Sequence, residues 1–288
     1  MHTIRILLED AQKTLKNSGI SSYQLDAELL LLHVLKKDRT YLYKNLDSSL
    51  NAAAQAEYKM LIEKRSKKMP IAYIRGFKEF WSRRFLVSPA VLIPRPETEM
   101  IIERVLEIAK EKNNAALDIL DIGTGSGNIA ITAAKELPNA LVTAIDISRD
   151  ALHVARENSK LHGVADKICF IHGNLFDSLP QSSTFDLILS NPPYVPTPDI
   201  EIPELQYEPC QALDGSADGL LYIKKIIDRA PAYLKKDGIV IIEIGYNQID
   251  ALQNFIEHTQ FSLNPFKDGN DVVRIIELRN KDHAKISN

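Results

Sequence analysis

Cysteine is scarce in this chain of 288 residues, and no part of the sequence has the pattern of a metal-binding motif. The two cysteines, Cys169 and Cys210, form no Cys-x-x-Cys pair, and the seven histidines form no cluster with metal-ligand spacing. We therefore expect no metal ion. Two isolated thiols are typical of a protein in a reducing compartment, so we predict a cytoplasmic localisation.

Long hydrophobic runs and a strong excess of one charge are also absent. The leucine run at residues 29–32 is too short to cross a bilayer, and the first twelve residues include acids instead of the apolar core of a signal peptide. With 35 basic and 38 acidic residues the formal net charge is −3, which argues against a general affinity for nucleic acid. We expect a monomer that binds neither membranes nor nucleic acid directly.

Glycine is nearly missing from residues 1–75, where Gly19 is the only one, and a small helical domain is predicted there. Apolar residues repeat at helical spacing in two stretches, and a third helix is expected between residues 52 and 67. The predicted core stripes are Ile4, Leu7, Leu8, Ala11 and Leu15 in the first helix, and Leu25, Leu29, Leu32 and Leu35 in the second.

Aromatic and β-branched residues follow in residues 76–93, with turn signals near Ser82 and Ser88, so a β-hairpin is predicted to join two domains. The next segment, Pro94-Arg95-Pro96-Glu97-Thr98-Glu99, is typical of a helix start, with Glu97 or Thr98 near the cap. The alternative is that Arg95, Glu97 and Thr98 line the entrance of a binding site.

From residue 117 the pattern is strand, glycine loop, helix, strand, which is typical of a doubly wound α/β sheet. The loop Gly123-Thr124-Gly125-Ser126-Gly127 follows Asp121 and lets the backbone approach a ligand closely. The next strand ends in Asp146, whose carboxylate could accept both hydroxyls of a ribose. Because the third glycine comes one residue earlier than in dinucleotide-binding loops, an adenosine-bearing ligand is favoured and NAD is the minority alternative.

Two further strand ends complete the predicted site. Ile147 follows Asp146 and is placed in the same cofactor site. The strand at residues 167–172 precedes Asn174 and Leu175, which could contact the edge and the face of an adenine ring, although a plain turn is the alternative. The strand at residues 185–190 ends in Asn191-Pro192-Pro193-Tyr194, a stiff turn because two prolines fix φ and remove two N–H donors.

This last turn suits the transfer of an activated methyl group. The Asn191 side-chain oxygen and the Pro192 carbonyl are two acceptors in fixed relation, which could hold both protons of a planar –NH2 group beside a sulfonium. Tyr194 could stack on that group and face the cation. The sequence offers no Ser-His-Asp set or paired carboxylates for hydrolysis. A rigid turn without catalytic function is the alternative.

These motifs together resemble the class I S-adenosylmethionine-dependent methyltransferases, and more narrowly the release factor glutamine methyltransferases (the PrmC/HemK family). The resemblance covers nearly the whole chain. Besides the two loops it rests on residues 72–81, residues 91–99, the acidic loop from Glu208 to Leu220, and Glu243-Ile244-Gly245 with Gln248. The Pro-Arg-Pro-Glu-Thr-Glu segment and the acidic loop are more specific than Asn-Pro-Pro-Tyr, which adenine-N6 methyltransferases share.

The resemblance implies a seven-stranded, mostly parallel, Rossmann-like sheet that follows a helical bundle and a β-hairpin. Residues 1–75 would dock the substrate protein, 76–95 would be the hairpin linker, and 96–288 would be the catalytic domain. The implied reaction transfers a methyl group from S-adenosylmethionine to the side-chain nitrogen (N5) of the glutamine in the Gly-Gly-Gln loop of peptide chain release factors.

The resemblance also assigns the site residues. It implies that Asn191, Pro192 and Tyr194 are catalytic and that Pro193, Arg95 and Glu97 lie beside the substrate. The implied cofactor site consists of Asp121, Gly123, Thr124, Gly125, Gly127, Asp146, Ile147, Asn174, Leu175 and Asn191. Three departures from the family pattern are Asn174 where an acid is common, Gly-Ser at 215–216, and Ser82-Arg83-Arg84 in the hairpin.

Two other functions remain open from the sequence. An adenine-N6 methyltransferase acting on DNA or RNA would need a target-recognition domain and a basic groove. The net charge, the small helical domain and the acids Asp199, Glu201, Glu204 and Glu208 argue against it. A catalytically silent binding module is the other alternative, which the intact motifs make less favoured.

Overall fold

The structure is a computed structural model that describes residues 3–201 and 205–281. Its contacts divide the chain into two compact units. One comprises residues 1–77 together with 203–207, and the other comprises residues 78–202 together with 208–288. Glu204, one of the four acids that argue against an adenine-N6 methyltransferase, lies outside the described residues.

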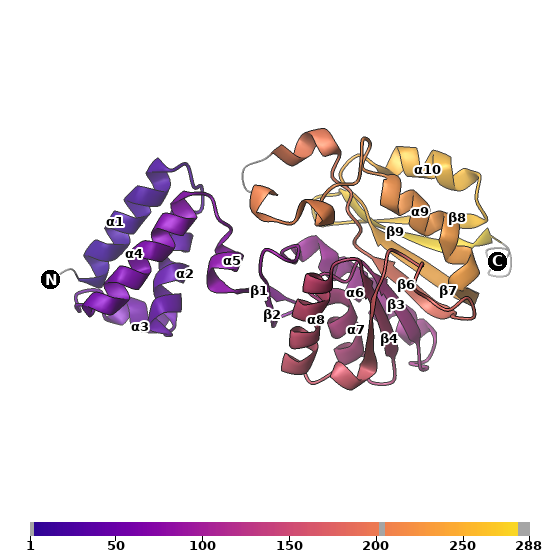
Figure 1. Ribbon diagram of the computed structural model, residues 1–288, viewed down its shortest axis with the longest axis horizontal. Coiled ribbons are helices and arrows are strands. Elements are labelled where there is room, and N and C mark those ends of the chain that lie inside the picture. The colour runs from indigo at the N-terminus through magenta and orange to yellow at the C-terminus, as the bar shows by residue number, and fades with distance from the viewer. Residues whose placement is uncertain (1–2, 202–204, 282–288) are drawn as a thin grey trace. The chain divides into compact units, whose positions relative to one another are not determined.

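The described part of the first unit is helical (Figure 1). Thr3, Asp38 and Asn51 each accept a backbone N–H bond at the start of a helix. Two of the helices are single short turns of five or six residues, too short to show a period in the sequence. The helices are α1 (Ile4–Asn17), α2 (Tyr23–Leu35), α3 (Arg39–Lys44), α4 (Ala52–Ser66) and α5 (Ile71–Arg75).

The predicted core stripe is confirmed for α1 and only in part for α2, where Leu32 and Leu35 are half-buried against the core. All five residues predicted for α1 are buried. In α2 the buried apolar residues are Ala27, Leu30 and Leu31, whereas Leu25 is 46% exposed. Four consecutive leucines cover more than one face of a helix, so their spacing does not identify the buried face. Asp26 is also buried there, because Arg65 of α4 pairs with its carboxylate at 2.7 Å.

The predicted hairpin is present as β1 (Phe77–Phe80) and β2 (Arg83–Leu86). Trp81 and Ser82 form the turn, and both have positive φ, a conformation in which glycine is common. Phe80 and Phe85 are fully buried and pack edge to face at 6.0 Å between ring centroids. Side-chain burial therefore stabilises a turn that contains no glycine.

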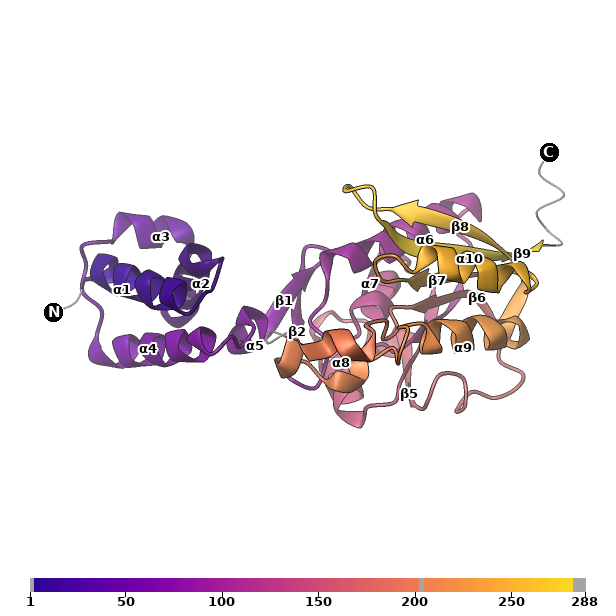
Figure 2. The ribbon, with the colours of Figure 1, turned by 90° about the horizontal axis from the view of Figure 1, so that it is seen from above.

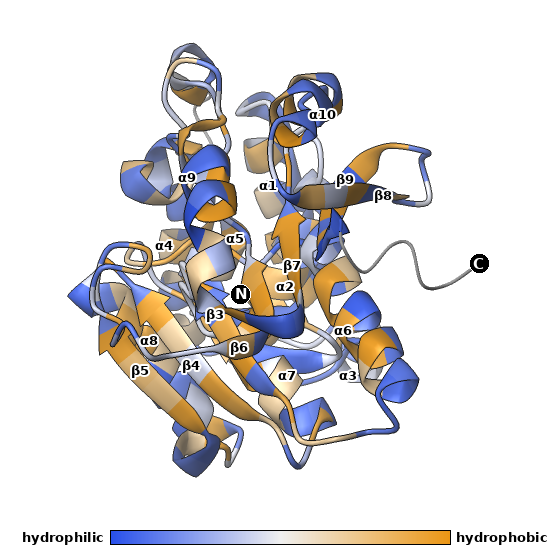
Figure 3. Cartoon of the chain, turned by 90° about the vertical axis from the view of Figure 1, so that its right-hand side faces the viewer, coloured by the Kyte–Doolittle hydropathy of each residue, from blue (hydrophilic) through white to orange (hydrophobic). Residues whose placement is uncertain are grey.

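The described part of the second unit contains the predicted seven-stranded sheet, in the order β5-β4-β3-β6-β7-β9-β8. The first five of these strands are mutually parallel, and β9 runs antiparallel to both of its neighbours. Figure 3 shows the hydrophobic character of the central strands. The strands are β3 (Asp118–Ile122), β4 (Leu141–Asp146), β5 (Ile168–His172), β6 (Phe185–Ser190), β7 (Leu234–Glu243), β8 (Phe261–Lys267) and β9 (Val273–Asn280).

Helices cover both faces of this sheet (Figure 2). One face packs against α6 (Glu99–Glu111), α7 (Asn128–Glu136) and α8 (Arg149–Leu161), and the other against α9 (Leu221–Arg229) and α10 (Ile249–Glu257). Successive residues of β3 show the alternation, since Ile119 belongs to the first core and Leu120 to the second. The chain adds β4 and β5 on one side of β3 and then returns to add β6 on the other side. Ligands of open α/β sheets bind at such a switch point, here between β3 and β6.

The start of β7 differs from the sequence prediction. The sequence pattern predicts a helix over residues 220–234 and a turn at residues 235–238. In the structure, α9 ends at Arg229 and β7 begins at Leu234. Phe185 of β6 pairs with Leu234 and Leu187 pairs with Ile239, so the predicted turn is an irregularity inside the strand. Short propensity signals cannot distinguish a turn between elements from a bulge within one.

Candidate functional site

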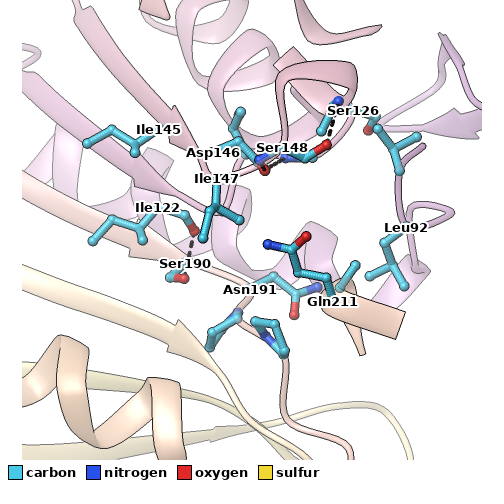
Figure 4. A pocket seen from close by; sticks show the side chains of 18 of the residues that line it. Leu92, Ile122, Ser126, Ile145, Asp146, Ile147, Ser148, Ser190, Asn191 and Gln211 are labelled. Carbon is cyan, nitrogen blue, oxygen red and sulfur yellow. Dashed lines mark hydrogen bonds between the residues drawn. The ribbon is translucent and has the colours of Figure 1, made fainter. Parts of the chain in front are cut away.

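A pocket lies at the carboxyl ends of β3, β4, β5 and β6, where the switch point between β3 and β6 predicts a ligand site (Figure 4). Pro209, Gln211 and Ala212 of the acidic loop contribute to its wall. The structure places ten of the predicted site residues in the lining: Gly123, Thr124, Gly125, Asp146, Ile147, Asn174, Leu175, Asn191, Pro192 and Pro193. Asp121, Gly127, Tyr194, Arg95 and Glu97 lie outside it, and the predicted roles of all these residues stay predictions.

The glycines of the loop after β3 have two different surroundings. A Cβ on Gly123 would meet nothing within 4 Å, and one on Gly125 would meet only the Gly123 carbonyl at 4.0 Å, so open space lies above this backbone. A Cβ on Gly127 would lie 2.8 Å from Ile131 Cδ1 and 3.2 Å from Ala155 Cβ. The first two glycines therefore leave room for a ligand, and the third allows α7 to pack closely on α8.

Asp146 joins the glycine loop after β3 to the segment that follows β4. Its carboxylate accepts the N–H of Gly125 at 2.8 Å and the N–H of Ser148 at 2.8 Å. Burial raises the pKa of this carboxyl, and those two bonds oppose the shift. Each carboxylate oxygen has more than one acceptor position, so both can still accept a hydroxyl. The neighbouring Ile147 is 47% exposed and offers an apolar surface in the same pocket.

Asp121 lies beneath the glycine loop. Its Oδ2 accepts the Thr124 hydroxyl at 2.6 Å and the Ala130 N–H at 3.2 Å, so it ties the loop to the start of α7. Its Oδ1 is buried without a hydrogen-bond partner. Burial raises the pKa of Asp121 from 3.8 to about 7.

This buried carboxyl should make folding stability depend on pH. A raised folded-state pKa means that the folded chain holds the proton more tightly, so the contribution of Asp121 to the free energy of unfolding falls as pH rises from about 4 to about 7. Asp121→Asn should remove up to about 4 kcal/mol of that fall. Denaturant titrations at several pH values measure it, with the exposed Asp150→Asn as the control. An unchanged pH dependence in Asp121→Asn would contradict the assignment.

Asn191 is oriented by residues from two other elements. Its Nδ2 donates to Thr98 Oγ1 at 3.0 Å, and the Thr98 hydroxyl donates to Glu243 Oε2 at 2.6 Å. Tyr194 reaches the other oxygen of the same acid, donating to Glu243 Oε1 at 3.0 Å. Asn191 and Tyr194 of the turn are thus both bound, directly or through Thr98, to one buried carboxylate at the end of β7.

The backbone of the turn is held by Gln248. Its Nε2 donates to the Tyr194 carbonyl at 3.0 Å, and its Oε1 accepts the Gly245 N–H at 2.7 Å. Gly219 approaches the same point, since a Cβ there would lie 2.3 Å from the Tyr194 oxygen and 2.5 Å from Gln248 Nε2. The acidic loop, the turn and the segment after β7 therefore meet at a single carbonyl group.

The segment before α6 does not form the predicted side-chain cap. A short 3-10 helix (Pro96–Thr98) precedes α6, and Thr98 occupies the N-cap position without capping a backbone N–H. Its hydroxyl is used by Asn191 and Glu243, and its side chain lines the pocket. Arg95 lies outside the lining and donates to Glu208 Oε1 at 2.6 Å, while Glu208 Oε2 accepts the Ile93 N–H at 3.0 Å.

The sequence prediction assigned no site role to Glu243, Gln248, Gly219 and Gln211. It placed Thr98 at the site entrance only as the alternative to a helix cap, and Thr98 does line the pocket. Gln211 belongs to the acidic loop and, with Asn191 and Ile147, faces the same space in Figure 4. A signal existed for Glu243, because it is an acid at the end of an otherwise apolar buried strand, and such a group requires hydrogen-bond partners. No pattern in the sequence identifies those partners.

The described residues contain neither a membrane-spanning helix nor a cluster of metal-ligating side chains. None of their helices is both long and apolar enough to cross a membrane. In the same residues, no group of three or more histidine, cysteine, aspartate or glutamate side chains could hold a metal ion.

Known families and proteins match both units. Residues 7–76 match the family described as PrmC N-terminal domain, and residues 113–280 match the family described as Methyltransferase domain. The chain is 40% identical to a release factor glutamine methyltransferase of Geobacter sulfurreducens, with 90% of each chain covered. It is 38% identical to a bifunctional methyltransferase of Rickettsia bellii over 96% of this chain and 55% of that protein. The chain thus spans about half the length of such bifunctional relatives.

The fold is also found in solved structures of low sequence identity. A methyltransferase from Pyrococcus furiosus superposes with a TM-score of 0.52 at 21% identity, covering 79% of this chain and 98% of that one. The seven-stranded, mostly parallel sheet flanked by helices is therefore a methyltransferase fold.

Proposed function

The chain belongs to the release factor glutamine methyltransferases, and we propose that it transfers a methyl group from S-adenosylmethionine to the side-chain nitrogen (N5) of the glutamine in the Gly-Gly-Gln loop of a peptide chain release factor. The observation that carries this proposal is the orientation of Asn191. Its Nδ2 is bound by Thr98, so its Oδ1 is left to accept a proton from a substrate –NH2 group.

The residues around the pocket fit an adenosine-bearing cofactor. Open space lies beside Gly123 and Gly125, Asp146 offers carboxylate oxygens to ribose hydroxyls, and Ile147 offers an apolar surface to the base. S-Adenosylmethionine supplies a methyl group on a sulfonium, which is already activated for transfer to a nucleophile.

The protein's part in the reaction is to place and orient the nucleophile. Asn191 Oδ1 and the Pro192 carbonyl hold the two protons of the glutamine –NH2 group, which directs the nitrogen lone pair away from them. Two consecutive prolines keep these acceptors in fixed relation, so little reorganisation is needed at the moment of transfer. Tyr194 stays neutral, because burial and Glu243 raise the pKa of its hydroxyl, and its ring stacks beside the amide.

No strong base is needed to complete the reaction. The bond between the methyl carbon and sulfur breaks as the new N–C bond forms, which leaves neutral S-adenosylhomocysteine and a cationic nitrogen. A proton on that nitrogen is then acidic enough to leave to water. Glu243 does not serve as the base in this scheme, because both of its oxygens already accept hydroxyl protons from Thr98 and Tyr194. The site therefore acts by positioning and by stabilising charge.

We also infer the setting of this reaction. The substrate is a protein of the translation machinery, so the enzyme acts in the cytoplasm, and one copy of the chain contains the whole pocket, which is consistent with a monomer. The net charge of −3 argues against direct binding of nucleic acid. Adenine-N6 methylation is the alternative, because an aminopurine also presents a planar –NH2 group.

One labelling experiment distinguishes these functions. The protein is incubated with S-adenosylmethionine labelled in its methyl group and with a bacterial release factor, with the same factor carrying Gln→Ala in its Gly-Gly-Gln loop, or with duplex DNA. We expect label on the unmodified release factor alone. Label on DNA, or label that survives the Gln→Ala change, would refute the proposed function.

A further inference from the structure

We propose that Glu243 and Thr98 are positioning residues that set the direction of the hydrogen bonds around Asn191 and thereby turn its side-chain oxygen toward the substrate. This inference deepens the proposed function and rests on it. Neither residue needs to touch the reacting atoms. Their action is to exclude the opposite orientation of the Asn191 amide, which would present an –NH2 group to the substrate –NH2 group.

The three residues come from separate elements and meet at the pocket wall, which Asn191 and Thr98 line and Glu243 does not. Thr98 ends the 3-10 helix before α6, Asn191 follows β6, and Glu243 ends β7. Thr98 and Glu243 are each 1% exposed, so water does not compete for their hydrogen bonds. The distances along the chain of bonds are 3.0 Å from Asn191 to Thr98 and 2.6 Å from Thr98 to Glu243.

The direction of these bonds follows from the number of protons. An ionised carboxylate only accepts hydrogen bonds, so Thr98 must donate its single hydroxyl proton to Glu243. The Thr98 oxygen can then only accept, and the sole donor on the Asn191 side chain is Nδ2. The orientation of the Asn191 amide is therefore set by the negative charge of Glu243, two hydrogen bonds away.

The same acid also positions the aromatic ring. Glu243 Oε1 accepts the Tyr194 hydroxyl at 3.0 Å, so one carboxylate orients both the amide and the ring of the turn. A neutral Glu243 would have a proton to donate and one oxygen fewer to accept with. Thr98 would then be free to donate to the oxygen of Asn191, and the amide would lose its single orientation.

The surroundings of Glu243 make its protonation state sensitive to pH. Burial raises the pKa of Glu243 to about 7, with Glu97 acting in the same direction. The hydroxyls of Thr98 and Tyr194 and the charge of Arg274 on β9 oppose that shift. Turnover should consequently fall as pH decreases through about 7, because protonation of Glu243 removes the acceptor that fixes the direction of the bonds.

The first test compares two substitutions at one position. Thr98→Val keeps the shape of the side chain and removes the hydroxyl, whereas Thr98→Ser keeps the hydroxyl. We expect kcat on a release factor to fall at least about tenfold in Thr98→Val and to be largely retained in Thr98→Ser, with the affinity for S-adenosylmethionine close to wild type in both. The melting temperature should stay close to wild type in Thr98→Ser and fall by several degrees in Thr98→Val, because the buried Glu243 loses one of its donors. Equal kcat values for the two variants would overturn the proposal.

The second test uses Glu243→Gln and does not depend on activity alone. In ¹⁵N spectra, the side-chain amide signals of Asn191 should shift between pH 6 and 8 in the wild type and stay constant in Glu243→Gln. The loss of activity toward low pH should disappear in the same variant. Asp150→Asn, which removes an exposed acid of α8, should keep both effects.

The outcomes separate this inference from the proposed function. A wild type that labels no release factor refutes the proposed substrate, and the ¹⁵N spectra then still decide whether Glu243 orients Asn191. Asn191 signals that ignore pH in the wild type, or that titrate equally in Glu243→Gln, would overturn the positioning role. If the melting curve shows that Glu243→Gln is unfolded, Thr98→Val takes its place in the ¹⁵N spectra. The Asn191 side-chain signals of Thr98→Val must then differ from those of the wild type.

Discussion

Asn191→Ala should lower kcat on the order of 10²- to 10³-fold while the affinity for S-adenosylmethionine changes little. The substitution removes one of the two acceptors that hold the substrate –NH2 group, so the nucleophile is no longer placed in line with the methyl group. It leaves the glycine loop and Asp146 intact, because their hydrogen bonds do not involve Asn191. Single-turnover methylation and calorimetric titration measure the two quantities separately.

Asn174→Ala is the matched control for this result. Asn174 is an asparagine in the same pocket, at the end of β5, and we assign it to the adenine side. Its replacement should weaken cofactor binding and leave the turnover of the saturated enzyme close to wild type. If Asn191→Ala instead abolishes cofactor binding, or Asn174→Ala produces the larger loss in kcat, the division of roles between the two residues is wrong.

Gly219→Ala should have the second largest effect, lowering kcat on the order of 10²-fold. An added Cβ would lie 2.3 Å from the Tyr194 carbonyl oxygen, so either the acidic loop or the Asn-Pro-Pro-Tyr turn must move. The same carbonyl accepts the bond from Gln248, and displacement of the turn would therefore also weaken its anchor. A shift of about 1 Å is enough to misalign the two acceptors with the methyl group.

The positive φ of Gly219 requires a control of its own, because alanine is strained in that conformation at any site. Gly163 has a similar φ of +67°, and a Cβ there would meet nothing within 4 Å. Gly163→Ala should thus cost about 1 kcal/mol of stability and leave kcat unchanged. Melting curves and kcat are measured for both variants, and similar kcat values would show that the contact with Tyr194 is unimportant.

The sheet could be predicted because its parallel strands are buried on both faces and appear as short apolar runs. The pattern predicts a helix over about residues 128–136 and a strand over residues 141–145 that ends in Asp146, and α7 and β4 have these bounds. The failures have local causes. The four leucines of α2 conceal which face is buried, and the turn residues before Ile239 lie inside β7. In both places a local pattern is compatible with two structures, and tertiary packing selects one.

The site was predictable only where a motif is continuous in sequence. Gly123, Gly125 and Asn191 were identified because each stands directly at the end of a predicted strand. Thr98 and Glu243 are 145 residues apart, and neither residue indicates in the sequence that the other is its hydrogen-bond partner. A helix cap was therefore the favoured prediction for Thr98, since that is the ordinary role of a threonine before a helix, and a place at the site entrance was the alternative. Arg95 was assigned to the substrate, whereas in the structure it pairs with Glu208.

The hydrogen-bonded chain from Asn191 through Thr98 to Glu243 has a consequence for folding cooperativity. Its members are separated by 93 and 145 residues, so the chain of bonds closes only after α6, β6 and β7 have docked. Contacts of such large sequence separation are costly in loop entropy and are characteristic of late folding events. Catalytic competence is thus a property of the fully assembled unit, and methylation activity can serve as a sensitive reporter of its global folding.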